Sequence, residues 1–416
     1  MSRLARLWLD VSPLRDSQAY RRLWVGDLVA SAGSQMAAVA LPYQVYSLTG
    51  SSLAVGLIGL AALGPLLLGS LAAGAIADAF DRRRLLIASQ LASAGCCLAL
   101  ALLSAAGRPP LGALYVLAAL LAFASSIESP VRNAVIPSLV GIDRVPAAAA
   151  LNQIVNQTSQ IAGPAVAGVL LAAFGIATTY AVGVADFTLA VLVAIALPSL
   201  RPLGSAAAPG WAALKEGLAF ARSQPALLGT FVVDLNAMVF GMPRALFPAL
   251  AAGTFAVGPR GLGLLYSAPA VGALVAALSS GWIGRVRRQG IAVMASVVAW
   301  GLAIAVFGLV PGDLFWLALV LLAAAGAADV VSAVFRNTIM QQVTPDQLRG
   351  RMSALHIAVV TSGPRLGDAE SGLVASATSV QFSVVSGGLI CIAGVGLLQL
   401  IAPALAHYRK PEKPCQ

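Results

Sequence analysis

Long apolar runs alternate with short polar interruptions along almost the whole chain. Most runs hold about 20 residues or more, which is the length that an α-helix needs to cross the hydrocarbon core of a bilayer. Counting the runs predicts twelve membrane-spanning helices, at about 22–47, 53–76, 85–106, 111–131, 146–172, 176–198, 226–251, 261–283, 290–311, 314–335, 352–377 and 379–405. An even number of spans places both termini on the same side of the membrane.

The composition extends this interpretation to the whole chain. Of the 416 residues, 59% are hydrophobic and 10% are charged, whereas a soluble protein carries about 25% charged residues. A water-soluble fold of this size would lack the polar residues needed to cover its surface, so we expect an all-α integral membrane protein.

The residues typical of enzymes and metal proteins are scarce. The two histidines and four cysteines do not have the spacing of metal ligands, and no nucleophile–histidine–acid set or phosphate-binding loop is present. We therefore expect no enzymatic activity, no metal and no cofactor. A process driven by an ion gradient is favoured over one driven by ATP.

The net charge of +10 could indicate a nucleic-acid partner, but its distribution argues against one. The basic residues fall between the apolar runs, and three of them form the block Arg82–Arg84. If both termini are cytoplasmic, the external turns hold only Arg108 and Arg260, as the positive-inside rule requires. The Ala, Gly and Arg bias, with only three lysines, indicates a GC-rich bacterial genome. We expect a multi-pass protein of the bacterial cytoplasmic (inner) membrane, in contact with its lipids and with no nucleic acid bound.

The longest polar interruption divides the chain into two halves. It contains Pro202, Gly204 and Pro209, followed by the amphipathic stretch 211–220, which predicts a helix along the membrane surface. The expected organisation is a cytoplasmic N-terminal segment 1–21, a six-helix bundle 22–198, a cytoplasmic linker 199–225, a second six-helix bundle 226–406 and a cytoplasmic tail 407–416.

The two halves share short sequence matches in the same order, at offsets of 200 to 207 residues. These are Asp27-Leu28 with Asp234-Leu235, Pro42 with Pro248, Arg132-Asn133 with Arg336-Asn337, and Gly163-Pro164 with Gly363-Pro364. Such matches indicate duplication of a six-helix unit, with the two copies related by a pseudo-two-fold axis.

The turn between the second and third runs reads Gly-Ala-Ile-Ala-Asp-Ala-Phe-Asp-Arg-Arg-Arg, from Gly74 to Arg84. It resembles the Gly-x-Leu-Ala-Asp-Arg-x-Gly-Arg-Lys loop of the major facilitator superfamily, with Ala79 in place of an arginine. The resemblance implies a loop that switches between conformations, formed by Gly74, Asp78, Asp81, Arg82 and Arg83. In the family, the aspartate matching Asp78 interacts with the N-terminal end of the eleventh helix, where Arg351 lies here.

Two further segments resemble exporters of this superfamily. Gly163, Pro164 and Gly168 on the fifth span are similar to a Gly-Pro-x-x-Gly-Gly motif that accompanies proton-coupled antiport, although small residues can also serve only helix packing. The segment from Thr344 to Arg351 resembles the exporter subgroup that includes macrolide efflux proteins and the enterobactin exporter. The resemblance covers essentially the full chain and implies drug:proton antiport.

Charged residues inside the apolar runs are candidates for function, because each costs about 2.5–3.5 kcal/mol at the centre of a bilayer. Arg365 and Asp368 are spaced i, i+3 and could pair. From their depths, we expect a proton-coupling polar network of Arg244, Asp329, Arg365, Asp368 and Glu370. Asp368 or Glu370 would exchange protons during transport. A static lattice of salt bridges is the alternative.

Two more pairs of charges have open interpretations. Asp27 and Asp234 could guard a cytoplasmic gate, or they could be acids in the first turn of a helix, where the dipole favours them. Glu128 and Arg132 could form a local pair or a latch with the Asp78 loop.

The polar residues Gln35, Asn152, Asn156 and Asn236 are candidates for lining a substrate cavity. We expect a monomer that exports a drug-like or siderophore-like small molecule by alternating access, coupled to protons. A proton-coupled importer of a small metabolite is an alternative, and a membrane sensor or scaffold that does not transport is another.

Overall fold

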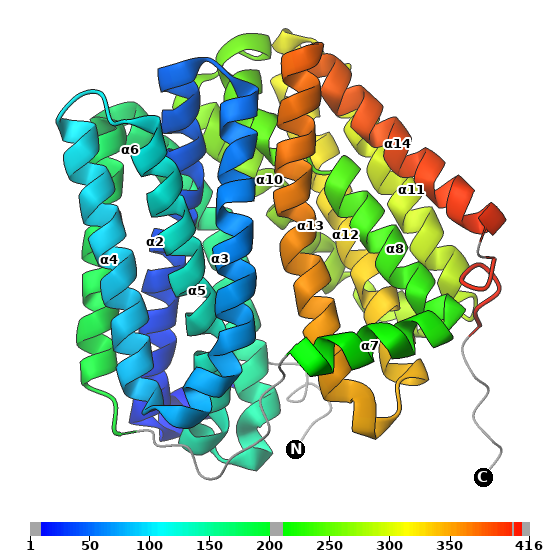
Figure 1. Ribbon diagram of the computed structural model, residues 1–416, viewed down its shortest axis with the longest axis horizontal. Coiled ribbons are helices and arrows are strands. Elements are labelled where there is room, and N and C mark those ends of the chain that lie inside the picture. The colour runs from blue at the N-terminus through cyan, green and yellow to red at the C-terminus, as the bar shows by residue number, and fades with distance from the viewer. Residues whose placement is uncertain (1–9, 200–210, 402, 410–416) are drawn as a thin grey trace. The chain divides into compact units, whose positions relative to one another are not determined.

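The computed structural model describes residues 10–199, 211–401 and 403–409, apart from the side chains at 74, 75, 77, 78, 211–213 and 401. All regular secondary structure in these residues is helical (Figure 1). The main helices are α1 (Ser12–Asp16), α2 (Gln18–Thr49), α3 (Ser52–Ala79), α4 (Arg82–Ala105), α5 (Leu111–Val140), α6 (Val145–Ile195), α7 (Trp211–Ser223), α8 (Pro225–Phe240), α9 (Phe247–Ala249), α10 (Gly258–Leu278), α11 (Gln289–Phe307), α12 (Phe315–Val343), α13 (Arg349–Ala377) and α14 (Val380–Ile401).

Within the described residues, nine elements are long and apolar enough to cross a membrane. One of them, Ile142–Ile195, holds 54 residues, which is far more than a single crossing requires. The helices α2 and α13 have 32 and 29 residues but are not among the nine, because polar and charged residues lower their mean hydropathy. The chain is therefore a multi-pass, all-helical membrane protein.

The long helix α6 is broken at Gly175, in the gap expected between the fifth and sixth spans. The backbone of Gly175 has φ 80° and ψ −178°, a conformation that is open to glycine and strongly disfavoured for residues with a Cβ. Glycine at this position therefore allows the chain to leave one helix and start another with no intervening loop.

The span expected at 226–251 is present as the single element Pro225–Thr254, but its helix is interrupted. The helix α8 ends at Phe240, and the chain continues through a 3₁₀ turn at Arg244–Leu246, the short α9 and a π-helical turn at Leu250–Thr254. Pro243 and Pro248 account for the division, because proline has no amide hydrogen to donate and its ring crowds the preceding turn.

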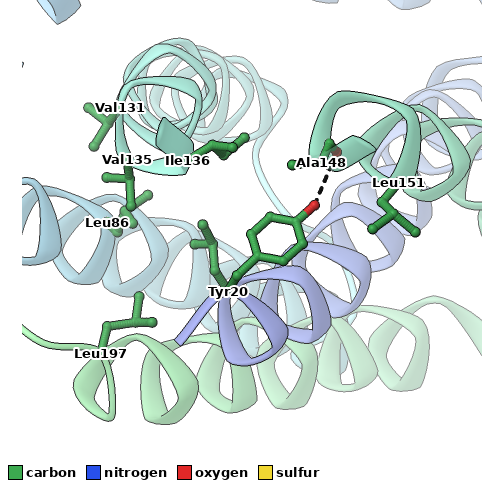
Figure 2. Close-up of a cluster of buried hydrophobic side chains, with 9 residues drawn as sticks. Tyr20, Leu86, Val131, Val135, Ile136, Ala148, Leu151 and Leu197 are labelled. Atoms are coloured by element: carbon green, nitrogen blue, oxygen red, sulfur yellow. Dashed lines mark hydrogen bonds between the residues drawn. The ribbon is translucent and has the colours of Figure 1, made fainter. Parts of the chain in front are cut away.

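The described residues of Met1–Leu41 and Gly64–Ala208 form one compact unit, called unit 1 below. In unit 1, α4 packs against both α5 and α6. A core cluster surrounds Tyr20, whose hydroxyl donates to the carbonyl of Ala148 at 3.0 Å (Figure 2). Leu86 and Leu151 belong to the same cluster, so α2, α4 and α6 are joined here by apolar contact.

Pro42–Leu63 and the described residues of Pro209–Gln416 form the second compact unit, unit 2. Here α12 packs against α10 and α11, α11 against α14, and α13 against α8. The linker helix α7 lies against α8 and α13, with its residues Leu214, Leu218 and Phe220 packed on a buried cluster of unit 2. Its apolar face is thus covered at least in part by protein. Glu216 of α7 also forms an ion pair of 2.7 Å with Arg351 at the start of α13.

Candidate functional site

Unit 1 contains a buried cluster of two acids and one arginine. Nη1 of Arg132 lies 2.5 Å from Oδ1 of Asp27 and 3.3 Å from Oε1 of Glu128. Glu128 and Arg132 are one turn apart on α5, and Asp27 approaches from α2; the hydroxyl of Ser31 donates to Asp27 at 3.2 Å. The side chain of Asp27 is only 2% exposed. Charges this deep need partners, and each member of the cluster has one.

Unit 2 contains a cluster of the same composition. Nη1 of Arg336 on α12 lies 2.8 Å from Oδ1 of Asp234 on α8, and Nη2 lies 3.7 Å from Oδ1 of Asp329. Arg336 and Asp234 are 5% and 2% exposed, whereas Asp329 is 27% exposed. Arg336 and Asp234 therefore form a close ion pair, and Asp329 interacts with Arg336 more weakly.

These clusters correct one interpretation of the sequence. Asp27 and Asp234 each lie nine residues after the first residue of their helix, so neither is in a first turn where the helix dipole would stabilise it. What stabilises each of them is an arginine on another helix. The repeat contained the missing signal, because the Asp-Leu and Arg-Asn matches recur together at nearly one offset.

A polar cavity of about 190 Å³ adjoins the cluster of unit 1. It is lined by hydroxyl and amide side chains of α2, α5 and α6, and by both Glu128 and Arg132; the residues are Ala30, Ser31, Ser34, Gln35, Ser125, Glu128, Ser129, Arg132, Asn156, Ser159 and Gln160. The hydroxyl oxygen of Ser159 is buried without a hydrogen-bond partner among the described residues. A buried polar atom of this kind is available to a ligand or a water.

The four predicted cavity residues separate into two groups. Gln35 and Asn156 line this cavity. Asn152 instead accepts a hydrogen bond from the Tyr20 hydroxyl at 3.2 Å, and Asn236 of unit 2 donates to the carbonyl of Cys391 at 2.8 Å. Four other lining serines and Gln160 were missed, since isolated hydroxyl residues in an apolar helix are common and carry little signal; the serines are Ser31, Ser125, Ser129 and Ser159.

The five-residue network expected in the second half is divided as well. Nη1 of Arg365 lies 4.0 Å from Oδ2 of Asp368 on α13, so this pair is present but long. Asp329 lies with Arg336 instead, as described above. Arg244, in the 3₁₀ turn after α8, interacts electrostatically with both Asp329 and Asp368. Glu370 is half-buried and has no ion pair or hydrogen bond within the described part of the chain.

The glycines of the two Gly-Pro matches make equivalent helix contacts. A Cβ added to Gly163 would lie 2.5 Å from Cβ of Gln35, and one added to Gly363 would lie 2.7 Å from Cβ of Met238. Both contacts leave room only for hydrogen. Pro164 lies inside α6, and Gly168 is buried there.

The expected switch loop is described in part. Asp81 caps α4 by accepting from the backbone amide of Arg83 at 2.9 Å, and it also accepts from the hydroxyl of Ser199 at 2.6 Å. Arg82 donates to the carbonyl of Ala134 at 3.0 Å, and Arg83 donates to a carbonyl of α6. Gly74 and Asp78 lie outside the residues whose side chains are described.

Comparison with known proteins adds a family. Residues 9–410 match the model of the family described as transmembrane secretion effector. The enterobactin exporter EntS of Citrobacter koseri is 29% identical over 408 residues, covering 97% of this chain and 96% of its own. The exporter of the same name from Escherichia coli K12 is 29% identical over 412 residues, with the same coverage.

Solved structures show the same fold at low sequence identity. The peptide transporter POT in complex with sulfate aligns with a TM-score of 0.74 at 15% identity, over 95% of this chain and 96% of its own. A bacterial homologue of the iron transporter ferroportin aligns with a TM-score of 0.71 at 15% identity, over 94% of this chain and 99% of its own. The chain is thus a transporter homologue and not an enzyme, and it belongs to the transmembrane secretion effector family of the major facilitator superfamily.

Proposed function

We propose that this protein is a secondary active transporter that exports a small molecule in exchange for protons. The relatives that match over nearly the whole chain are named as exporters. Transport would follow alternating access between two six-helix bundles related by a pseudo-two-fold axis, with both termini in the cytoplasm. Nine elements are long and apolar enough to cross. Twelve spans would follow if Ile142–Ile195 crosses twice, once on each side of Gly175, and if α2 and α13 also cross.

The observation that carries the proposal is the buried pair of Glu128 and Arg132 in the wall of a polar cavity. Hydroxyl, amide and charged groups in membrane-spanning helices are costly unless they have partners or line a pathway. A polar small molecule could replace the missing partner of Ser159 and complete the hydrogen bonds of Gln35 and Asn156. The cavity therefore supports a polar or amphipathic substrate rather than a purely apolar one.

The ion-pair distances support one assignment of the proton sites. A carboxylate that binds a proton gives up most of the attraction of its ion pair. Asp27 would lose an ion-pair contact of 2.5 Å. Asp368 would lose a contact of 4.0 Å with Arg365 and a further attraction to Arg244, and it also accepts from the backbone amide of Ala245. Glu370 would lose no ion pair among the described residues. We assign proton exchange to Asp368 or Glu370, and we assign the close pairs of Asp27 and Asp234 to holding the helices of the gate together.

The substrate class follows from the relatives and from the cavity. The relatives export enterobactin, as their names state. The amides and hydroxyls around Gln35, with one arginine nearby, suit a siderophore-like or drug-like molecule that bears hydrogen-bonding groups.

Transport by purified protein in liposomes tests the function, with enterobactin and a macrolide as the two probes. An exporter that exchanges its cargo for protons accumulates a probe in liposomes with an acidic lumen, and the pH of the lumen rises. An importer coupled by symport would accumulate the probe only in liposomes with an alkaline lumen. A sensor or scaffold would not accumulate the probe under either condition.

The proton sites are tested by Asp368→Asn and Glu370→Gln, with Asp346→Asn as the control because Asp346 lies in an exposed 3₁₀ turn and is 80% exposed. At least one of the two variants should lose accumulation driven by the pH gradient while it still exchanges labelled for unlabelled probe. Full retention of coupling in both variants would contradict the assignment and leave the transport function itself standing.

The switch loop is tested separately. We expect Asp78→Asn to leave the protein folded, with an unchanged elution volume in size exclusion, and to slow transport at least several-fold. Turnover at the wild-type rate would exclude a role for this aspartate in the conformational cycle.

A further inference from the structure

A second hollow in unit 1 lies on the outer surface of α4 and α5 and has a different character. It holds about 510 Å³ and is lined almost wholly by carbon atoms, including those of Leu85, Ala92 and Gly95 on α4 and Leu117, Leu120 and Ile127 on α5. Small residues on α4 face the larger leucines of α5, and this mismatch leaves a groove between two helices that are otherwise in contact. We call it the α4–α5 groove.

Ser89 supplies the one hydroxyl among the described residues that line the groove, and its hydrogen bond is already made. That hydroxyl donates to the carbonyl of Leu86 at 3.0 Å. The groove therefore offers no free hydroxyl or amide from the side chains that line it. A chain of methylene groups fits this surface, and a polar substrate does not.

Arginines stand at one end of the groove. A polar hollow of about 760 Å³ is lined by Arg83, Arg84 and Asp81, together with Ala79, Phe80, Ile87 and Ser199. Arg84 is next to Leu85 in the chain and one turn before Ala88, and both of these line the groove. The two hollows therefore follow each other along the first turns of α4.

Arg84 is the arginine best placed to bind an added anion. It is exposed, and the structure gives it no ion pair or hydrogen bond among the described residues. Arg83 donates to a backbone carbonyl of α6, a neutral acceptor that does not cancel its charge. Among the described residues that line the hollow, the one acid is Asp81, which caps α4 and accepts from the Ser199 hydroxyl.

The length of the groove matches one leaflet of a bilayer. Its α4 wall runs from Leu85 to Cys96, which is about 16 Å along a helix. The hydrocarbon core is about 30 Å thick, so one leaflet contributes about 15 Å. An acyl chain that fills the groove thus ends close to Arg84, at the depth where the headgroup begins.

We propose that the α4–α5 groove and Arg84 form a binding site for one anionic glycerophospholipid of the membrane. One acyl chain lies between the small residues of α4 and the leucines of α5, and the phosphate is held by Arg84 with Arg83 beside it. Recognition combines apolar burial, which any lipid with a suitable chain provides, with charge, which distinguishes phosphatidylglycerol from a zwitterionic lipid. The site does not depend on the transport function proposed above.

The test is native mass spectrometry of the purified full chain titrated with phosphatidylglycerol or phosphatidylcholine of identical acyl chains. The wild type should bind phosphatidylglycerol about fivefold more tightly than phosphatidylcholine at this site. This factor corresponds to the binding energy of about 1 kcal/mol that one arginine contributes near an anionic lipid surface. Arg84→Gln should remove that preference. Its control is Arg108→Gln, an exposed arginine at the opposite end of the same two helices, which should keep it.

The groove is tested by filling it. A Cβ added to Gly95 meets no atom within 4 Å, and the same holds for Gly112, which lies outside the groove. Gly95→Leu should weaken the binding of both lipids, and Gly112→Leu should leave the binding of both unchanged. Inorganic phosphate added at the same concentration as the lipid should not displace it, because phosphate has no acyl chain to bury.

Three results would overturn the proposal. They are equal binding of the two lipids by the wild type, equal behaviour of Arg84→Gln and Arg108→Gln, or equal behaviour of Gly95→Leu and Gly112→Leu. Displacement of the lipid by phosphate alone would be a fourth such result, because it would reduce the site to a simple anion site. Arg84 and Gly95 are both exposed, so the variants are expected to fold.

Discussion

At the residue scale, the main finding is that the most deeply buried charges lie in clusters, whereas the half-buried Glu370 has no partner among the described residues. Asp27 binds Arg132 from a neighbouring helix, and Asp234 binds Arg336 in the same way. Sequence analysis identified Asp27 and Asp234 as an equivalent pair and could not identify their partners. The rotation of two helices about their own axes decides which side chains meet, and this rotation depends on packing that a hydrophobic pattern does not encode.

Burial makes the pair of Asp27 and Arg132 important for stability. Asp27→Asn leaves the arginine with one looser acid partner, and breaking a buried pair of this kind costs about 3–5 kcal/mol. We therefore expect a clear fall in the thermal unfolding midpoint, measured by fluorescence in detergent micelles. The triple variant Asp27→Leu, Glu128→Leu and Arg132→Met should recover much of the loss, because it removes all three members of the cluster and leaves no unpaired charge.

The control is a close ion pair on the surface. Asp346 and Arg349 are 2.9 Å apart but 80% and 62% exposed, and exposed pairs contribute about 0–1 kcal/mol. Asp346→Asn should therefore leave the midpoint almost unchanged. If the two aspartate variants were equally stable, the cluster would not hold α2 against α5.

At the element scale, the apolar runs predicted the helices well because length and hydropathy are strong constraints in a bilayer. The break at Gly175 lies in the expected gap, and α4 and α5 begin within three residues of their expected positions. The interruption after α8 was not foreseen. Pro164 and Pro364 lie inside continuous helices, whereas Pro243 follows the end of one, and the local sequence does not distinguish these outcomes.

The break in α6 depends on glycine. With φ near 80° and ψ near 180°, an alanine at position 175 would be strained by about 1–3 kcal/mol. Gly175→Ala should lower the thermal midpoint, although no neighbouring atom lies within 4 Å of the added Cβ. Gly95→Ala is the matched control, since that site is equally open but lies inside α4; it should stabilise by up to about 1 kcal/mol. If Gly175→Ala had a higher thermal midpoint than Gly95→Ala, the break at Gly175 would tolerate a side chain.

Close helix contact is the second property of α6 that can be measured. Gly163→Ala would press a Cβ against Gln35 at 2.5 Å, and overpacking of this kind costs about 1–3 kcal/mol. We expect a lower midpoint and slower transport, because α2 must move away from α6. At Gly183, on the part of α6 that follows the break at Gly175, an added Cβ lies 3.4 Å from the sulfur of Cys97, so Gly183→Ala should be tolerated. If Gly163→Ala transported at the wild-type rate, the close contact at Gly163 would not be required for transport.

At the scale of the whole molecule, each half carries a buried acid–arginine cluster and a Gly-Pro contact to an earlier helix. Sequence matches spaced 200 to 207 residues apart anticipated this recurrence. The polar cavity of unit 1 could be predicted only in part, because it is assembled from three helices and from serines that carry no pattern. The family, with relatives of 29% identity over 97% of the chain, supplies the transport function that the fold alone does not specify.

Coupling between cargo and protons is the central claim, and one measurement tests it most directly. Purified protein is placed in liposomes that hold a pH-sensitive dye and an acidic lumen, and the substrate probe is added outside. We predict that the probe accumulates and that the lumen becomes alkaline at the same time, with both signals abolished when the gradient is first collapsed by an ionophore. Accumulation of the probe at an unchanged rate and extent after the gradient has been collapsed would contradict proton-coupled export.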